Sequence, residues 1–149
     1  MIRKAYVHEI KDIYKIIQKN AEDGKLLPRS YNQLYENIRD FFVFEKNNNI
    51  IGICALHISW ENLAEIKSLA ILESERKNGI GTELLKACLK EAGDLGIKQV
   101  FTLTYVTEFF EKNGFKKVEK NSLPHKIWSE CINCVHFPNC NEIAMMIDL

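Results

Sequence analysis

A short basic turn with two glycines is the part of this sequence best suited to bind a charged ligand. Arg76 and Lys77 precede Gly79 and Gly81, and apolar residues then recur at every fourth position from Ile80 onward. Glycine lets a ligand approach the backbone closely, and the free N–H groups and positive dipole at a helix N-terminus attract phosphate. The turn therefore predicts a phosphate-binding loop, with an ordinary helix start as the alternative.

Two common phosphate-binding loops are excluded by the residues that follow this turn. A Walker loop carries Lys and then Ser or Thr after its last glycine, whereas Thr82 directly follows Gly81. A dinucleotide-binding fingerprint requires a third glycine near position 84, where Leu84 stands. The turn therefore matches neither of these nucleotide-binding patterns.

A cysteine-rich segment near the C-terminus is the second group with chemical potential. It holds three cysteines and one histidine, namely Cys131, Cys134, Cys140 and His136. Three thiolates and one imidazole suit a tetrahedral zinc ion, and His125 is an alternative fourth ligand. The other interpretations are a redox pair of Cys131 and Cys134, a thiol that lines a substrate pocket, and three reduced cysteines in an irregular loop.

Hydrophobic periodicity predicts the elements that must position these groups. Helices are expected over about residues 8–20, 31–40 and 107–113 and from Gly79 to about Gly93, and Ser30 with Gln33 forms a capping-box pattern. Strands are expected over 2–6, 41–45, 50–60, 64–72, 99–105, 115–119 and 142–148, and residues 120–141 are irregular. This order predicts one domain over residues 1–149, an α/β (α+β three-layer) fold with a mixed sheet.

Composition excludes several classes of protein. The 149 residues carry 20 Lys and Arg against 20 Asp and Glu, so no basic excess favours nucleic-acid binding. The longest apolar run, Ile50–Ile58, is shorter than the roughly 20 residues of a membrane span, and no apolar region follows Met1–Lys4. We therefore expect a cytoplasmic protein with no membrane contact, in which the five cysteines are reduced and Cys54 and Cys88 lie in the core.

The basic turn and its flanks resemble the GNAT superfamily of N-acetyltransferases. The pattern Arg76-x-x-Gly79-x-Gly81 resembles that family's acyl-CoA pyrophosphate loop, residues 65–71 resemble the strand before the loop, and residues 109–115 resemble a later helix-to-strand signature. The order of elements fits the family over essentially the whole chain. The resemblance implies a mostly antiparallel central sheet in which the strands at 65–72 and 99–105 are parallel and splay apart.

The resemblance also implies acetyl-CoA as cosubstrate and indicates which residues bind it. The pantetheine arm would enter the gap between the splayed strands along Leu69, Ala70 and Ile71. The pyrophosphate would be wrapped by Arg76, Lys77, Asn78, Gly79, Ile80, Gly81 and Thr82, and Phe110 of the later signature would also contact the cofactor. Many members carry Tyr where Phe110 stands, and that Tyr is often assigned to protonate the departing thiolate.

Several segments resemble the short, stand-alone form of the N-acetylglutamate synthase branch. They are Leu27–Ser30, residues 65–70, the aromatic pair at 109–110 and the Leu-Pro segment at 123–128. This resemblance implies transfer of acetyl to the α-amino group of an amino acid, with L-glutamate favoured, to make N-acetylglutamate for arginine biosynthesis. The alternatives are another small amine, a protein N-terminus, or a non-catalytic module that binds CoA or senses a metal.

The resemblance assigns the remaining roles. Glu65 is the candidate general base, acting through a water molecule, with a solvated glutamate at a strand end as the alternative. Thr104, Tyr105 and Thr107 are candidate proton donors to the thiolate, although Thr107 is equally suited to cap a helix. The candidate substrate-binding residues are Arg29, Lys67, Ser68 and Lys126, among which Arg29 suits a carboxylate best and the two lysines have solvent exposure as their alternative. Apart from the resemblance, Trp60 and Trp128 are candidates for a homodimer interface, with the core or a pocket as equal alternatives.

Overall fold

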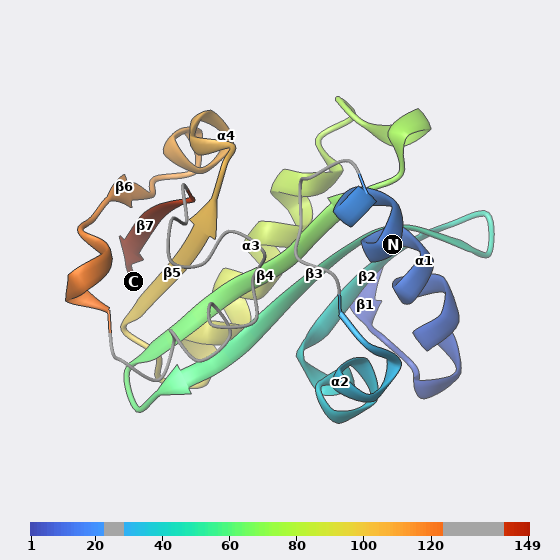
Figure 1. The fold of residues 1–149 in the computed structure, drawn as a ribbon, viewed down its shortest axis with the longest axis horizontal. Coiled ribbons are helices and arrows are strands. Elements are labelled where there is room, and N and C mark those ends of the chain that lie inside the picture. Colours follow the sequence, from blue (N-terminus) through green and yellow to red (C-terminus); the bar gives the residue numbers. More distant parts are fainter. Residues whose placement is uncertain (23–28, 124–141) are drawn as a thin grey trace.

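The computed structural model describes residues 1–22, 29–123 and 142–149, which build one seven-stranded sheet (Figure 1). The strands are β1 Ile2–Lys4, β2 Phe41–Lys46, β3 Asn49–Trp60, β4 Leu63–Ile71, β5 Gln99–Thr104, β6 Lys116–Lys117 and β7 Ile143–Asp148. Their spatial order is β1-β2-β3-β4-β5-β7-β6. The helices are α1 Ile10–Glu22, α2 Tyr31–Glu36, α3 Ile80–Asp94 and α4 Thr107–Lys112, with short 3-10 turns η1 Val7–Glu9, η2 Ile38–Asp40, η3 Glu73–Glu75 and η4 Lys120–Ser122.

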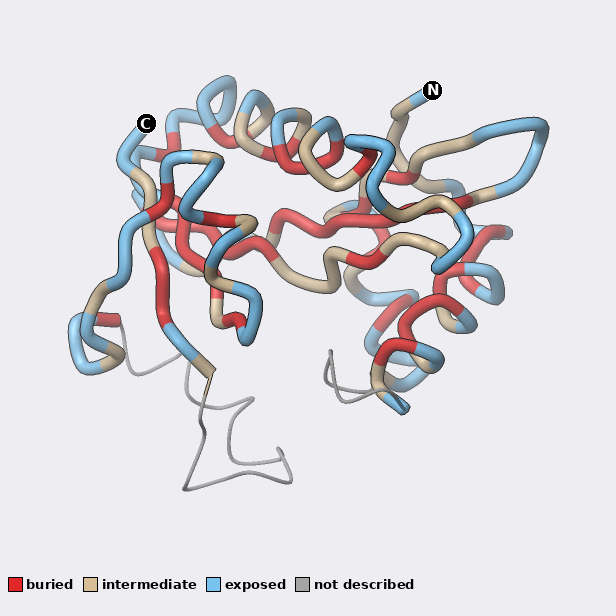
Figure 2. Tube along the Cα trace, turned by 90° about the horizontal axis from the view of Figure 1, so that it is seen from above, coloured by how far each residue is buried: buried red, intermediate tan, exposed pale blue. Residues whose placement is uncertain are grey.

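Helices cover both faces of the sheet, so the predicted three-layer arrangement is confirmed (Figure 2). The helix α3 packs on one face through Ile80, Leu84, Cys88 and Ala92, the four positions that the apolar repeat predicted to be buried. On the other face, α1 and α2 cover β2 and β3 through the cluster that contains Ile13, Ile17 and Leu34. We call these two sets of buried side chains the α3 cluster and the α1 cluster.

The strands β4 and β5 form a parallel pair that separates, as the family resemblance implied. Their pairing covers only residues 63–65 of β4 with 99–101 of β5, whereas the other neighbouring strands are antiparallel. At the end of the pairing, the Thr102 hydroxyl donates a hydrogen bond of 3.0 Å to the Ile66 carbonyl. Beyond this point the two strands diverge (Figure 1), so the β5-facing backbone edge of β4 is left without a strand partner among the described residues.

A β-bulge at Ser68 changes which side chains β4 presents to each face. Between the pairs Ile53–Ala70 and Ala55–Lys67, β4 contains one residue more than β3, and Ser68 adopts a left-handed φ of 54°. An extra residue reverses the alternation of a strand. Leu69 accordingly packs toward the α3 cluster and Ala70 toward the α1 cluster. The bulge was not predicted, because serine rarely adopts this conformation.

Three predicted boundaries are wrong. The helix expected over 31–40 stops at Glu36 because Asn37 leaves helical geometry, although the capping box of Ser30 and Gln33 that starts it is confirmed. The strand expected over 115–119 contains only Lys116 and Lys117, since the chain turns into η4 soon afterwards. Thr107 is the first residue of α4 rather than its cap, because Val106 holds the N-cap position.

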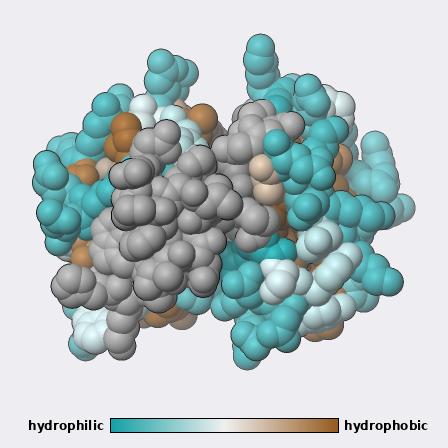
Figure 3. Space-filling view, viewed as in Figure 1, coloured by the Kyte–Doolittle hydropathy of each residue, from teal (hydrophilic) through white to brown (hydrophobic). Residues whose placement is uncertain are grey.

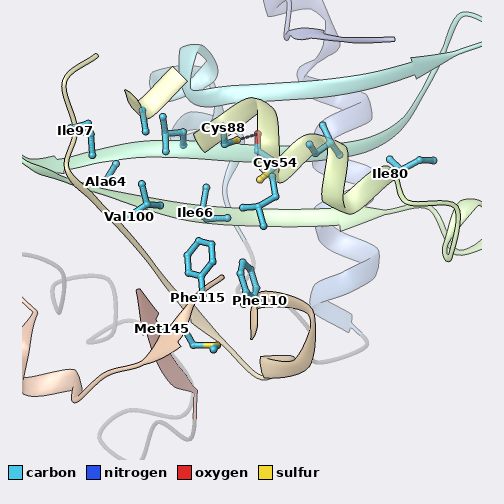
Figure 4. Close-up of a cluster of buried hydrophobic side chains, with 14 of the residues drawn as sticks. Cys54, Ala64, Ile66, Ile80, Cys88, Ile97, Val100, Phe110, Phe115 and Met145 are labelled. Atoms are coloured by element: carbon cyan, nitrogen blue, oxygen red, sulfur yellow. Dashed lines mark hydrogen bonds between the residues drawn. The ribbon is translucent and has the colours of Figure 1, made fainter. Parts of the chain in front are cut away.

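Cys54 and Cys88 both lie fully buried in the α3 cluster, as predicted (Figure 4). Burial and the neighbouring Cys88 raise the pKa of the Cys54 thiol well above its usual range, with the Cys88 hydrogen bond as the larger cause. The same cluster receives Phe110 and Phe115, which lie against each other at 5.1 Å between ring centroids in an edge-on arrangement. These two rings connect α4 and the start of β6 to the main sheet.

Candidate functional site

A cavity of about 790 Å³ lies where β4 ends, α3 begins and α4 approaches. Its wall is formed by Ile71, Glu75, Arg76, Lys77, Gly79, Ile80, Gly81, Thr82, Lys86, Phe109, Lys112 and Asn113. Four of these residues are cationic and one is acidic, and that one, Glu75, forms an ion pair of 3.1 Å with Lys46 outside the wall. The cavity therefore carries an excess of positive charge and fits an anionic ligand.

The backbone of the glycine turn adds hydrogen-bond donors to this charge. Gly79 is the N-cap of α3 with a left-handed φ of 77°, and no described side chain caps the helix there. The first N–H groups of α3 are thus available to a ligand. A Cβ atom on Gly81 would stand 3.4 Å from the ring of Phe109, so a larger residue would crowd the gap between α3 and α4.

Arg76 is anchored to two elements that lie far apart in the sequence. Its Nε donates to the Ile71 carbonyl, and one terminal nitrogen donates to the Asn20 side-chain oxygen, each at 3.4 Å. Asn20 is buried on α1 and donates at 2.8 Å to the Ile16 carbonyl. Sequence analysis overlooked Asn20, although a polar residue on the apolar face of a helix was a usable signal.

Lys86 and Lys112 are two further cavity residues that sequence analysis missed. Lys86 stands one helical turn beyond Thr82 on α3, a spacing that was visible in the sequence. Lys112 ends α4, and only the packing of α4 beside α3 brings it to the cavity. Phe110, a predicted cofactor contact, is 3% exposed and points into the α3 cluster (Figure 4), whereas its neighbour Phe109 lines the cavity.

The predicted cofactor-binding residues that are not in the cavity wall, namely Asn78, Leu69 and Ala70, lie next to the cavity. Asn78 is exposed in the turn between Lys77 and Gly79. Leu69 and Ala70 are partly buried and buried, respectively, on the bulged end of β4, which leads to Ile71 at the cavity wall. The loop and the diverging strand are therefore continuous in space.

Glu65 occupies the last paired position of β4, where the two strands begin to separate. It is only 8% exposed, so the alternative of a solvated glutamate at a strand end is wrong. One carboxylate oxygen lies 4.0 Å from the Lys67 ammonium group, and each side chain is 11% exposed. Lys67 is therefore not the freely exposed lysine that was its alternative, and the pair forms a largely buried ionic contact.

The three candidate proton donors occupy different positions near the end of β5. Thr104 is buried, and its hydroxyl oxygen accepts a hydrogen bond of 2.9 Å from the Val106 N–H, which leaves the hydroxyl hydrogen free to be donated. Tyr105 is 39% exposed, and Thr107 lies in the first turn of α4. Thr104 is the buried member of the three and lies on the strand that diverges from β4.

Arg29 directly precedes the N-cap of α2 and is half-buried, and its Nε atom is buried with no hydrogen-bond partner among the described residues. A buried donor without a partner is costly, so this position suits a ligand that supplies an acceptor. Ser68 forms the β4 bulge, two residues beyond Ile66. Lys126 and the predicted metal ligands Cys131, Cys134, Cys140 and His136 lie outside the described residues, as does the alternative ligand His125.

The described ranges contain neither a cluster of metal ligands nor a membrane-spanning helix. Among residues 1–22, 29–123 and 142–149, no group of three or more His, Cys, Asp or Glu side chains is placed to hold a metal ion. Within the same residues, no helix combines the length and apolar character needed to cross a membrane. On the face shown in Figure 3, hydrophilic residues cover most of the described surface.

Curated relatives of this chain are acetyltransferases. It is 39% identical over 145 residues to an uncharacterized N-acetyltransferase of Chlorobaculum tepidum, covering 97% of this chain and 94% of that protein. It is 31% identical to an amino-acid acetyltransferase of Mycobacterium tuberculosis, covering 87% of this chain and 76% of that protein. A Vibrio cholerae amino-acid acetyltransferase is 34% identical over 83% of this chain, which spans only 28% of that longer protein.

Solved structures show the same architecture. An N-acetylglutamate synthase of Neisseria gonorrhoeae, complexed with coenzyme A and N-acetyl-glutamate, matches all of this chain with a TM-score of 0.91 at 28% identity, and the match covers 35% of that enzyme. A Mycobacterium tuberculosis protein in complex with CoA matches with a TM-score of 0.86 at 27% identity over 99% of its length. The model of the Acetyltransferase (GNAT) family matches residues 7–115. With its loop, diverging strands and these matches, the chain belongs to the GNAT family of acetyltransferases.

Proposed function

We propose that this N-acetyltransferase moves an acetyl group from acetyl-CoA to the α-amino group of an amino acid, with L-glutamate as the favoured acceptor. The product, N-acetylglutamate, would enter arginine biosynthesis. Two relatives that are at least 31% identical are named amino-acid acetyltransferases, and the Neisseria structure holds coenzyme A and N-acetyl-glutamate. Since this chain spans about a third of that Neisseria enzyme, the substrate is a proposal for this chain.

The observation that carries the proposal is the meeting of two features at the diverging strands. The cationic cavity at the start of α3 supplies charge and free N–H groups for the phosphates of CoA. From there the edge of β4 that has no strand partner among the described residues leads back along Ile71, Ala70 and Leu69 toward Glu65. An extended acyl arm can pair with such an edge as an added strand does. The thioester would then lie close to Glu65 and to the end of β5.

The reaction follows from the groups at this point. The buried Glu65 carboxylate attracts the substrate's ammonium group and removes a proton from it, directly or through water. The neutral amine attacks the thioester carbonyl, and N–H groups of β4 stabilise the oxyanion that forms. When the C–S bond breaks, the Thr104 hydroxyl is placed to donate a proton to the thiolate, because its oxygen is already held by the Val106 N–H.

Recognition of the acceptor's carboxylate is assigned to Arg29. Its Nε atom is buried without a described partner, and a guanidinium group binds a carboxylate through two parallel hydrogen bonds. Lys67 lies beside Glu65 and adds positive charge on the same side of the sheet, where it would favour an acceptor with a second carboxylate. Lys126 keeps its predicted role in substrate binding.

The experiment is an acceptor panel with the purified full chain. Acetyl-CoA is mixed with L-glutamate, L-glutamine, L-aspartate, L-lysine, a polyamine and a peptide with a free N-terminus, and free CoA thiol and the acetylated product are both measured. We expect the highest kcat/KM with L-glutamate. Turnover of another acceptor in preference to glutamate would refute the substrate, and binding of acetyl-CoA with no turnover of any amine would refute the enzymatic role.

A further inference from the structure

A hydrogen-bonded pair of Asp40 and His57 lies beside the candidate base. Nδ1 of His57 stands 2.7 Å from Oδ2 of Asp40, which ends η2 directly before β2. A carboxylate can only accept a hydrogen bond, so Nδ1 carries the hydrogen and the neutral imidazole keeps Nε2 as a proton acceptor. The carboxylate thus sets both the orientation and the tautomer of the ring.

The sheet register places this histidine next to Glu65. His57 of β3 and Glu65 of β4 are directly opposite each other in an antiparallel pair. Side chains in such a pair lie on the same face of the sheet, with Cβ atoms about 4.5–5.5 Å apart. Alternate residues of a strand lie on one face, and Ile53 and Ala55, four and two residues before His57, belong to the α1 cluster. The side chains of His57 and Glu65 therefore lie on the sheet face that α1 and α2 cover further along.

Acetyl transfer to an ammonium group has a surplus of one proton. The nitrogen loses two protons when an amide forms, the departing thiolate gains one, and the other must leave the enzyme. Glu65, at 8% exposure, has little contact with water, whereas the His57 side chain is 36% exposed. An imidazole also changes its charge between about pH 5 and 8, so it can accept a proton and release it at neutral pH.

We propose that His57, oriented by Asp40, receives the proton that Glu65 takes from the acceptor amine and releases it to solvent. The proposal rests on the proposed amine acetylation. In the step itself, the proton of the protonated Glu65 carboxyl passes through one water molecule to Nε2 of His57, which restores the Glu65 anion and forms an imidazolium paired with Asp40. The imidazolium then loses the proton to water. His57 thus acts through Glu65 and does not touch the amine.

The charges around His57 favour this transfer. Asp40 approaches it from η2 on one side of β3, and Glu65 stands opposite it on β4 on the other side, so carboxylates lie on both sides of this histidine. Lys67 stands opposite Ala55, two pairs further along the strands and therefore on the same face, and is 4.0 Å from Glu65. Lys67 is thus the cation in contact with Glu65, and Asp40 is the carboxylate in contact with His57.

Kinetics of the full chain test the relay. His57→Gln should lower kcat roughly 10- to 100-fold at pH 7.5 with little change in either KM. This is less than the roughly 10²- to 10⁴-fold that a direct acid or base contributes, because His57 acts through Glu65. In the wild type, kcat/KM should fall as the pH drops through the titration of His57, because the imidazolium cannot accept. His57→Gln should lack this acid limb, so its deficit should shrink as the pH decreases. A deficit that is equal at every pH would overturn the proposal.

Two variants sharpen the kinetic test. Asp40→Asn keeps an oxygen that can accept from Nδ1 but removes the charge, so the acid limb should move to lower pH while kcat falls less than in His57→Gln. His8→Gln is the matched control, because His8 is an exposed histidine of η1 that stacks on Tyr6, and its profile should match the wild type. An unchanged acid limb in Asp40→Asn would count against the relay.

A titration of His57 by NMR gives an answer that does not depend on activity. The His57 ring resonance is identified by its loss in His57→Gln, and Glu65→Gln should shift its titration midpoint to lower pH. If the enzyme acetylates glutamate but Glu65→Gln leaves the titration midpoint of His57 unchanged, the relay is overturned and the proposed function stands. If Glu65→Gln shifts the titration of His57 but the protein acetylates no amine, both the proposed function and the relay are overturned.

Discussion

The two ends of the diverging strands differ in how their charges are compensated. At the cavity end, Arg76, Lys77, Lys86 and Lys112 surround a space with one acidic wall residue, and that residue is paired with Lys46. At the other end, the polar groups are paired with one another, as in the ionic contact of Glu65 with Lys67 and the hydrogen bond of Asp40 with His57. The cavity end thus requires an anion, whereas the groups of the Glu65 end already have partners within the protein.

This difference indicates how each end recognises its ligand. An excess of cations with free helix N–H groups binds a polyanion strongly but with little discrimination of its remaining structure. Groups that are largely buried and already paired do not bind a ligand more tightly because it carries an opposite charge. Their interaction with a ligand depends on its geometry and on where its protons lie. Changes at the cavity end should therefore alter binding, and changes at the Glu65 end should alter turnover.

The largest expected effect is on turnover, from Glu65→Gln. The amide cannot take a proton from the amine, so kcat should fall by about 10²- to 10³-fold. The dissociation constant for acetyl-CoA, measured by calorimetry, should stay within about twofold because Glu65 is not part of the cavity wall. Glu61→Gln is the matched control, since Glu61 is exposed in the turn between β3 and β4. A full-strength Glu65→Gln enzyme would remove this residue as base.

The next effect is on cofactor binding, from Arg76→Glu. The change removes one of four wall cations and places a repelling charge beside the phosphates, so the KM for acetyl-CoA should rise roughly 100-fold. At saturating acetyl-CoA, kcat should stay close to the wild-type value. Lys98→Glu carries the same charge change at an exposed position after α3 and should leave the KM unchanged. A pure kcat defect in Arg76→Glu would contradict the division between the two ends.

The cavity end was also the easier end to predict from sequence. Arg76, Gly79 and Gly81 follow one another closely, and the apolar repeat of α3 is regular, so local pattern was enough. Lys112 and Asn20 reach the same region only through packing between distant elements, and no local pattern reports that. Phe110 was predicted to contact the cofactor, but Phe109 lines the cavity and Phe110 is buried. Which of two adjacent aromatic residues faces the cavity depends on the rotation of the six-residue helix α4 about its axis, and the sequence of two adjacent rings does not determine that rotation.

The Glu65 end was harder because its geometry depends on strand pairing. Glu65 was identified from a family resemblance, but its burial follows from the pairing of β3, β4 and β5. His57 drew no attention in the sequence, since its importance lies in its register with Glu65 and in the reach of Asp40. The Ser68 bulge reverses the face of every later β4 residue, and strand periodicity cannot reveal it.

A smaller effect, confined to the acceptor, is expected from Arg29→Gln. The variant loses a charge-assisted contact to a carboxylate, which contributes about 1.5–3 kcal/mol, so the KM for L-glutamate should rise at least about 10-fold. The KM for acetyl-CoA should not change. Arg39→Gln is the control, because Arg39 is an exposed arginine of η2. An equal loss for glutamate and for an amine that lacks a carboxylate would show that Arg29 does not read the acceptor.

The smallest effect on activity should come from the hydrogen-bonded pair of Arg3 and Glu9. This pair lies before the start of α1 and belongs to neither the cavity end nor the Glu65 end of the diverging strands. Arg3 donates to both carboxylate oxygens of Glu9, at 2.9 and 2.7 Å, and this hydrogen bonding lowers the pKa of Glu9 despite its burial. A carboxyl whose pKa is lower in the folded state stabilises the fold above its unfolded pKa, near 4.5, and this contribution is lost as the pH falls. Acidification should therefore weaken the attachment of α1.

Glu9→Gln tests this pair and the separation of the two ends together. At pH 7 the variant should lose about 1–3 kcal/mol of unfolding free energy in urea, because it gives up a buried charge-assisted contact. The difference from the wild type should shrink as the pH falls below about 4.5 and on through the lowered pKa of Glu9, and a constant difference would show that charge is not its cause. Glu22→Gln, at the exposed end of α1, should be neutral. Because the hydrogen bond by which α1 contacts the cavity wall, from Arg76 to Asn20, is long at 3.4 Å, the KM for acetyl-CoA should change no more than about twofold and kcat not at all.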